Sequence, residues 1–213
     1  LELINEVLDM GKLESGEVIL EERSFCLNEI LDELQTVIEK QAAERGIQII
    51  REEYQISHMH LIGSPRHVKR MLMNIMSNAV KYNKENGTIW LGCRELPASE
   101  FLENVCVPEA EQDCFVSDNV LKDIQNCAKD SEKNRQEQMF RRIWIEFTCK
   151  DTGIGMSKEF LDHLFEPFTQ EENGARSAYG GSGLGMSITK SLIEKMGGTI
   201  HVESEQGEGT IYI

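Results

Sequence analysis

Amide and ammonium side chains recur along one predicted helix at the spacing of successive turns. Asn74, Asn78 and Lys81 fall within an arc of about 60° when residues are placed ~100° apart around a helix. An amide oxygen is a hard, neutral ligand that can complete a Mg²⁺ shell while the metal keeps waters and phosphate oxygens. The ammonium offers a phosphate a point charge. The spacing favours a metal and phosphate site over an ordinary polar helix face only if other segments supply the rest of a nucleotide site.

The first such segment follows a β-rich stretch. Asp151 stands at the end of that stretch and precedes Gly153 and Gly155. A carboxylate at a strand end can accept a hydrogen bond from the exocyclic amine of adenine, which guanine lacks at that position. The glycines let the backbone approach a flat ring. Taken alone, the segment would be an ordinary Asp-Thr-Gly turn.

A second glycine-rich segment runs directly into a helical pattern and reads Gly180-Gly181-Ser182-Gly183-Leu184-Gly185. Unpaired N–H groups and the dipole at a helix N-terminus favour phosphate. The spacing matches neither the Rossmann nor the Walker pattern. We therefore expect Gly181, Gly183 and Gly185 to form a phosphate-binding loop of another type.

A polar stretch without periodicity, residues 165–183, separates the two glycine segments. Phe165 and Phe168 at its start are expected to be hydrophobic anchors of a lid or core residues, and the two roles are compatible. Arg176 lies within the stretch, where it either contacts a γ-phosphate or remains a solvated loop arginine.

Composition limits the class of protein. With 213 residues the chain can hold one full domain and a fragment of another. Its net charge of −15 disfavours nucleic acid as a partner. The six cysteines form no CxxC pair and are expected to be free thiols in a reducing cytoplasm. No apolar run approaches the ~20 residues of a membrane span, so we expect no direct membrane contact by this chain.

Hydrophobic periodicity predicts the elements that position these residues. Helices are expected at 1–13, 27–42, 64–82, 157–164 and 184–196, and strands at 18–22, 47–54, 61–62, 88–94, 143–150, 199–203 and 210–213. This mixture lacks regular alternation and predicts an α+β fold. We expect a two-layer α/β sandwich whose mixed sheet is covered by helices on one face, with a short N-terminal helix fragment.

An acidic insertion is predicted between two of these strands, at residues 95–139. It has eleven acidic and four basic residues, which gives a net charge of −7. Loops of this length are uncommon within compact domains. The segment is either a solvated loop with one short helix or a partner-binding element.

Together the motifs resemble those of the ATP-binding catalytic domain of bacterial sensor histidine kinases, the Bergerat or GHKL fold. The similar segments are residues 74–83 (N box), 151–155 and 181–185 (glycine boxes), 165–168 (phenylalanine box) and Gly209-Thr210 (late threonine motif). The resemblance covers residues 17–213 outside the insertion. Residues 1–16 resemble the end of the second helix of a dimerisation and phosphoacceptor domain, in the style of hybrid kinases.

The resemblance implies a role for each matched residue. Asn78 would hold Mg²⁺ with support from Asn74, and Lys81 and Arg176 would contact phosphates. The other residues implied in ATP binding are Tyr82, Asp151, Gly153, Gly155, Phe168, Gly181, Gly183, Leu184, Gly185 and Thr210. The implied activity is phosphotransfer from Mg-ATP to a histidine, for relay to a response-regulator aspartate.

Two features depart from simple family membership. The insertion is far longer than the usual connection, and no histidine followed by Glu or Asp precedes the domain. The acceptor would therefore lie outside the chain, on a dimerisation domain of a homodimeric parent, with this domain in the cytoplasm and the parent either anchored in the inner membrane or not. The alternatives are a GHKL-fold ATPase and a degenerate nucleotide-binding interaction module. The ATPases of this fold resemble one another in a Glu at the position of Asn74, and an amide is no general base.

Overall fold

The computed structural model describes residues 2–97, 143–170 and 181–213. Within these ranges the elements are, in order, α1 (Glu2–Glu14), β1 (Arg23–Cys26), α2 (Leu27–Ala43), β2 (Gln48–Arg51), β3 (His60–Gly63), α3 (Pro65–Lys81), β4 (Thr88–Leu96), β5 (Trp144–Asp151), α6 (Lys158–His163), α7 (Gly185–Lys195), β6 (Val202–Glu205) and β7 (Gly209–Tyr212). The predicted insertion lies outside the described residues except for its first three positions. The sheet and the helices that pack on it belong to one compact unit, formed by Leu1–Arg94 and Glu146–Ile213.

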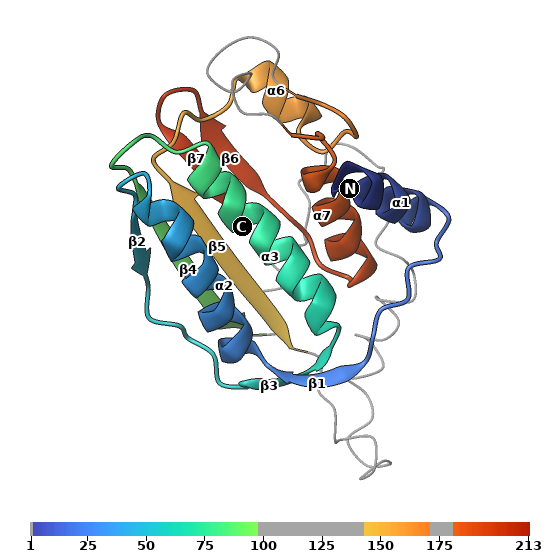
Figure 1. Ribbon diagram of the computed structural model, residues 1–213. Coiled ribbons are helices and arrows are strands. Elements are labelled where there is room, and N and C mark those ends of the chain that lie inside the picture. The colour runs from blue at the N-terminus through green and yellow to red at the C-terminus, as the bar shows by residue number, and fades with distance from the viewer. Residues whose placement is uncertain (1, 98–142, 171–180) are drawn as a thin grey trace, which may run out of the picture. The chain divides into compact units, whose positions relative to one another are not determined.

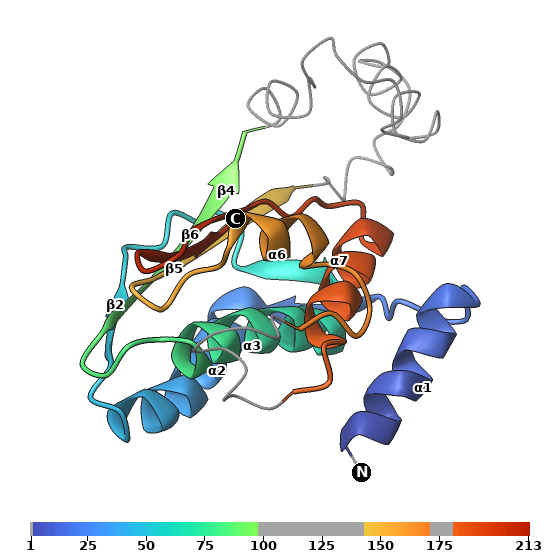
Figure 2. The same cartoon turned by 90° about the horizontal axis from the view of Figure 1, so that it is seen from above.

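A five-stranded mixed sheet forms one layer of this unit (Figure 1). Its strand order is β2-β4-β5-β7-β6, with β2 parallel to β4 and β7 antiparallel to both β5 and β6. Helices α2, α3 and α7 lie on one face of the sheet, and no helix covers the other face in the parts drawn as ribbon (Figure 2). The predicted α+β sandwich is confirmed, including its closing antiparallel strand pair.

Alternation along β4 separates the two faces of the sheet. Ile89, Leu91 and Cys93 are buried, whereas Trp90 between the first two and Arg94 after the last are only half-buried. Successive strand residues point to opposite faces, so the buried set faces the helices. Each fully buried large aliphatic side chain contributes about 1.5–3 kcal/mol relative to exposure. The helix-facing layer is therefore the main source of stability.

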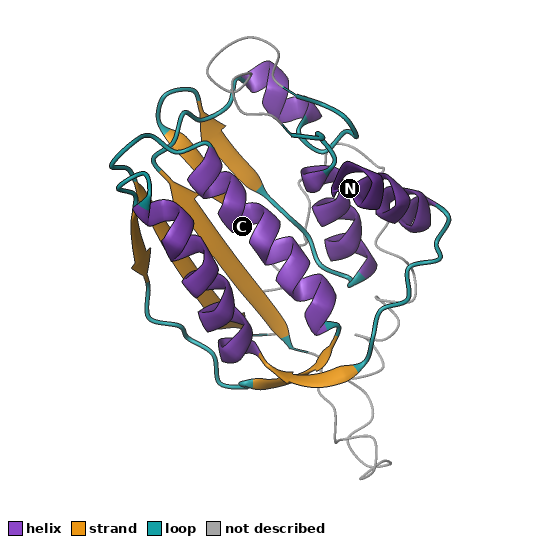
Figure 3. Cartoon of the chain, in the orientation of Figure 1, coloured by secondary structure: helices purple, strands orange, loops and turns teal. Residues whose placement is uncertain are grey.

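The two long central helices bury the apolar faces that their sequences predict. In α2, Leu31, Leu34 and Ile38 are nearly inaccessible to solvent, although Val37, expected on the same face, is 41% exposed. In α3 the buried residues are Met71, Leu72, Ile75, Met76, Ala79 and Val80. The helix pattern in Figure 3 places α3 between α2 and α7. Because both flanks of α3 are packed, its polar residues are held in a fixed rotation.

The predicted strand at 18–22 is wrong, since the chain forms β1 at Arg23–Cys26 instead. β1 pairs antiparallel with β3 in a separate two-stranded sheet. Val18 packs instead, with Met10 and Leu13 of α1, against a cluster of buried residues. That cluster consists of Met71, Leu184, Ile188 and Leu192. Packing against α7 thus overrides the weak alternation of the segment.

Other boundaries differ by a few residues. β6 begins at Val202 rather than at residue 199, because the preceding residues form the connection from α7. No helix within the described ranges has the length and apolar character needed to cross a membrane.

Candidate functional site

Helix α3 carries the two amides and faces α7. It begins at Ser64-Pro65, with proline in the first turn, where its missing N–H costs no hydrogen bond. Asn74 Nδ2 donates to Thr189 Oγ1 at 2.9 Å, and the Nδ2 atoms of Asn74 and Asn78 each lie 3.4 Å from Met186 Sδ. Both amide nitrogens therefore point toward α7, which fixes how each amide group is turned.

The second glycine segment lies against the polar face of α3. A Cβ on Gly185 would stand 2.5 Å from Asn74 Oδ1, and one on Gly181 would stand 3.1 Å from Lys81 Nζ. Side chains at these positions would displace the amide and crowd the ammonium. Gly185 also opens α7, after the fully buried Leu184. The structure therefore brings together the amides, the lysine and the N-terminus of α7.

Asp151 ends β5 on the helix-covered side and is only 5% exposed. Its Oδ1 accepts the Gly153 N–H at 2.7 Å, which fixes the carboxylate beside the first glycine segment. Across the sheet it pairs with Thr210 of β7, whose Oγ1 lies 3.0 Å from Ser204 Oγ. A Cβ on Gly209 would stand 2.0 Å from the Asp151 carbonyl oxygen. Only glycine permits this close approach.

The first glycine segment is held between α3 and the β6–β7 turn. Ile154 N–H donates to the Tyr82 carbonyl at 2.9 Å, immediately after α3 ends. Gly155 has φ +62, and a Cβ there would stand 1.9 Å from the Glu205 carbonyl oxygen. Tyr82 also has Lys81 Nζ 4.9 Å from its ring centroid. The segments holding Asp151, Tyr82 and Lys81 are thus adjacent in space.

The two phenylalanines before the second glycine segment differ. Phe168 is 62% exposed, with φ +63, and its N–H donates to the Gly183 carbonyl at 3.1 Å. The core-packing alternative is therefore wrong for Phe168. Phe165 is half-buried, and Lys190 Nζ lies 5.1 Å from its ring centroid. Arg176 lies outside the described residues.

Comparison with known proteins gives a match to one family model. Residues 63–213 match the model described as histidine kinase-, DNA gyrase B-, and HSP90-like ATPase. The chain belongs to this ATPase family. The resemblance stated from the motifs is confirmed at this level, and the matched region contains both glycine segments and α3.

Several sensor kinases are similar to this chain in sequence. The chain is 30% identical over 210 residues to the sensor histidine kinase GacS of Pseudomonas protegens, covering 99% of this chain and 18% of that protein. It is 28% identical over 212 residues to the signal transduction histidine-protein kinase BarA of Escherichia coli, covering all of this chain and 19% of that protein. The chain thus spans about a fifth of the length of these relatives.

Solved structures share the fold. Full-length ShkA in complex with AMPPNP superposes with a TM-score of 0.64 at 20% identity, covering 99% of this chain and 34% of that chain. The histidine kinase ThkA in complex with the response regulator protein TrrA gives a TM-score of 0.54 at 17% identity, covering 98% and 47%. At these identities the likeness concerns the fold of this ATPase family domain.

A buried polar cluster next to the site was not predicted. Asn83 is 2% exposed, and its Oδ1 lies 3.2 Å from Thr152 Oγ1, which in turn accepts the Thr88 N–H at 2.9 Å. The Thr152 N–H donates to the Thr88 carbonyl at 3.1 Å. The cluster joins the end of α3 to the first glycine segment. Its sequence signal was the polar Asn83 directly after Tyr82, which the motif included without a role.

The residues fit a magnesium site to which the protein supplies few ligands. Among the described residues no group of three or more His, Cys, Asp or Glu side chains could hold a metal ion. An amide oxygen can serve as a Mg²⁺ ligand while nucleotide phosphates and water complete the shell. The Asn78 amide suits this role, because its nitrogen is turned toward Met186 and its oxygen is the remaining ligand atom.

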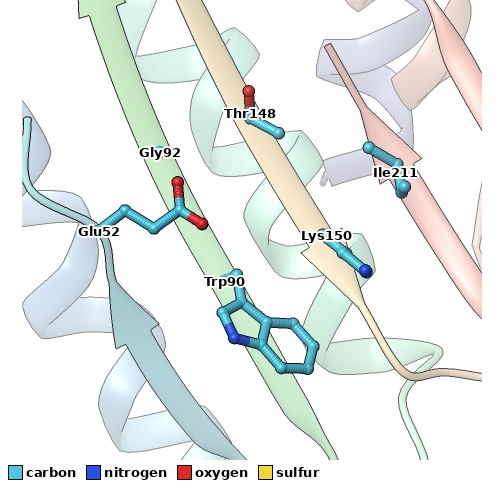
Figure 4. Close-up of a pocket in the computed structure, with 6 residues that line it drawn as sticks. All are labelled: Glu52, Trp90, Gly92, Thr148, Lys150 and Ile211. Atoms are coloured by element: carbon cyan, nitrogen blue, oxygen red, sulfur yellow. The ribbon is translucent and has the colours of Figure 1, made fainter. Parts of the chain in front are cut away.

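A shallow cavity of about 270 Å³ lies on the face of the sheet opposite α2, α3 and α7 (Figure 4). Its lining comprises Glu52, Trp90, Gly92, Thr148, Lys150 and Ile211. Lys150 Nζ lies 5.5 Å from the Trp90 ring centroid. None of the nucleotide motif residues lines this cavity, so it is separate from the candidate site.

Two buried thiols on neighbouring strands take no part in the site chemistry. Burial raises the pKa of Cys93 to about 12, with a further increase from Glu146 and a partial offset from Arg51. Burial, and secondarily the charge of Asp151, also raises the pKa of Cys149 well above its ordinary value. Both thiols stay neutral at physiological pH, and a neutral thiol is a poor nucleophile.

Proposed function

We propose that this chain is the catalytic domain of a two-component sensor histidine kinase that binds Mg-ATP. It transfers the γ-phosphate to a histidine outside residues 1–213. The observation that supports this most is the convergence of three separate segments: the amides of α3, the N-terminal end of α7, and the buried Asp151. Each suits a different part of an adenine nucleotide.

Asp151 accepts the adenine amine. A carboxylate offers about four acceptor positions on two oxygens, so it can hold the Gly153 N–H and the amine together. Gly153 and Gly209 keep Cβ atoms away from this carboxylate and its backbone, and Gly155 keeps one away from the Glu205 carbonyl. Asp151, Gly153 and Tyr82 form the adenine wall of the site, in which Tyr82 stacks near the base. Thr210 adds a hydroxyl beside Asp151.

The phosphates lie along α3 and the start of α7. Asn78, with support from Asn74, would hold Mg²⁺, which would supply positive charge to neutralise the phosphates. Lys81 contacts phosphate directly, and the N–H groups around Gly181, Gly183, Leu184 and Gly185 donate to phosphate oxygens at the helix N-terminus. Phe168 anchors the segment before the second glycine loop, and Arg176 contacts the γ-phosphate.

Water attack is poorly assisted at this site. Asn74 donates to Thr189 Oγ1 and is an amide, so it cannot take a proton from water at neutral pH. This observation disfavours a hydrolytic ATPase and leaves the γ-phosphate for a protein nucleophile.

The remaining partners follow from the same proposal. Residues 1–16 are the end of a dimerisation and phosphoacceptor helix, and residues 17–213 are the catalytic domain with its insertion at 95–139. The parent is a homodimer, and the phosphoryl group passes to a response regulator. ThkA, whose structure is a complex with the response regulator protein TrrA, supports this partner class. The domain acts in the cytoplasm, where ATP is present.

Phosphotransfer tests the proposal. Residues 1–213 incubated with γ-labelled ATP should acquire no acid-labile label. The longer natural protein, or a separately made acceptor domain added to the fragment, should acquire acid-labile phosphohistidine. Asp151→Asn should abolish that label. Asp32→Asn is a matched control, because Asp32 is an exposed residue of α2 that pairs with Arg51 of β2. Phosphate release without any phosphohistidine would contradict the kinase proposal.

A further inference from the structure

Arg45 contacts the end of the helix that carries the nucleotide motif. The half-buried guanidinium donates through Nη1 to the carbonyls of Val80 and Lys81, the latter at 2.9 Å. Through Nη2 it donates to the Asn83 carbonyl at 2.7 Å. A single side chain from the α2–β2 turn therefore binds three backbone oxygens at the C-terminus of α3.

The backbone around Arg45 reinforces this contact. Asn86 N–H donates to the Arg45 carbonyl at 3.1 Å, and Gln48 N–H donates to the Gly87 carbonyl at 2.9 Å. Gly46, with φ +66, passes so close to Asn86 that a Cβ there would stand 2.4 Å from Asn86 Oδ1. The α2–β2 turn and the α3–β4 turn thus form one hydrogen-bonded unit.

The chemistry of a helix end explains why an arginine is used. The last carbonyls of a helix lack intrahelical partners and carry partial negative charge. The guanidinium is always charged and has five donors in a rigid fork, so it can bind several carbonyls in one geometry. A lysine ammonium at the same place keeps the charge but lacks the fork. Hydrogen bonding from a charged group is stronger than between neutral groups.

The hydrogen bonds of Arg45 hold residues that belong to the candidate site. Lys81, whose carbonyl Arg45 holds, offers its ammonium to the second glycine segment. Tyr82, enclosed between the held carbonyls of Lys81 and Asn83, accepts the Ile154 N–H. The Asn83 side chain continues the contact to Thr152. Movement at the end of α3 would therefore shift the phosphate lysine and the adenine wall together.

We propose that Arg45 is a positioning residue for nucleotide binding, a role that rests on the proposed ATP site. It touches no substrate, and it holds Lys81 and Tyr82 in the conformation that binds ATP. Apparent affinity falls in proportion to the fraction of molecules in the competent conformation. If the end of α3 is ordered only about a tenth of the time without the guanidinium, ATP binds about tenfold more weakly.

Arg45→Met tests this, because it retains an apolar stem and removes all donors. Calorimetric titration with Mg-ATP, well below the melting temperature, should give an affinity about tenfold weaker. Arg45→Lys keeps the charge, and if it orders the end of α3 about a third of the time, it should bind about threefold more weakly. Hydrogen exchange at the Tyr82 and Ile154 amides, measured without nucleotide, should be faster in both variants.

Two controls separate positioning from simple loss of stability. Ile38→Val removes a fully buried methyl group of α2, so it should lower the melting temperature and leave ATP affinity unchanged. Arg23→Met removes an exposed arginine that pairs with Glu21, and it should change neither. Affinity within twofold of wild type and unchanged exchange in Arg45→Met would overturn the inference. If Arg45→Met does not fold, the same two results in Arg45→Lys would overturn it. Wild-type protein that ignores ATP would instead sink the proposed function, while the exchange comparison still decides whether Arg45 orders the end of α3.

Discussion

Replacing Gly153 with alanine tests whether the adenine wall is packed as tightly as the structure indicates. The added Cβ would stand 2.4 Å from the Tyr82 carbonyl oxygen and 2.7 Å from Asp151 Oδ1. Non-bonded heavy atoms prefer about 3.5–4.0 Å, so one side of the contact must move by roughly 1 Å. Either movement strains the hydrogen bond from Ile154 to Tyr82 or the one from Gly153 to Asp151.

The size of the effect follows from these contacts. Overpacking of this kind costs about 1–3 kcal/mol of unfolding free energy. For a chain of this length each kcal/mol lowers the melting temperature by about 2–4 °C. A hydrogen bond to the Asp151 carboxylate is worth about 1.5–3 kcal/mol, so its displacement weakens ATP binding at least about tenfold.

Scanning calorimetry and titration with Mg-ATP measure both quantities on one sample. Gly11→Ala is the matched control, because a Cβ at Gly11 on α1 meets no atom within 4 Å. In a helix this change should be neutral or stabilising by up to about 1 kcal/mol, without any effect on affinity. If Gly153→Ala melts within a degree of wild type and binds ATP equally well, the packing argument is wrong.

Three further predictions concern single residues. Asn74→Glu supplies a general base and should raise ATP hydrolysis in a folded variant, measured as phosphate release; unchanged turnover would count against the argument from the amide. Cys93, with a pKa of about 12, has a thiolate fraction of about 10⁻⁴ at pH 8. It should therefore resist alkylation in the native protein and react once urea unfolds the chain. Rapid labelling of the native protein would contradict its burial. The hydrogen bond to Glu166 raises the pKa of His163, so the protonated pair stabilises the fold below about pH 6.5 and this contribution is lost as pH rises through the raised pKa. An NMR titration should show that Glu166→Gln lowers the His163 pKa, and an unchanged value would exclude the pair.

Long periodic elements could be predicted because their pattern and their packing agree. The apolar spacing of α2 and α3 gave their extents to within one or two residues at each end, and the glycine segments marked the loops beside them. The order of the motifs along the chain indicated one nucleotide site, and the fold brings the motifs together in space. The segment at 18–22 was misassigned because a few alternating residues carry little information against packing on α7.

Other features depend on contacts that no local pattern encodes. Arg45 follows a helix whose end Gly46 signals, but its partners are carbonyls some 35–38 positions later in the chain. The Asn83 and Thr152 cluster likewise joins residues 69 positions apart. The exposure of Phe168 follows from its positive φ and its hydrogen bond to Gly183, neither of which is readable from an aromatic in a polar stretch.

Titration calorimetry with Mg-ATP and Mg-GTP, on wild type and Asp151→Asn, tests the central claim most directly. A buried carboxylate that reads the exocyclic amine predicts that wild type binds ATP and discriminates against GTP by at least about fivefold, since one unpaired buried polar group costs about 1–3 kcal/mol. The same account predicts that Asp151→Asn loses most of its ATP affinity while its melting temperature stays close to that of wild type. Equal binding of both nucleotides, or no ATP binding at millimolar concentration, would contradict it.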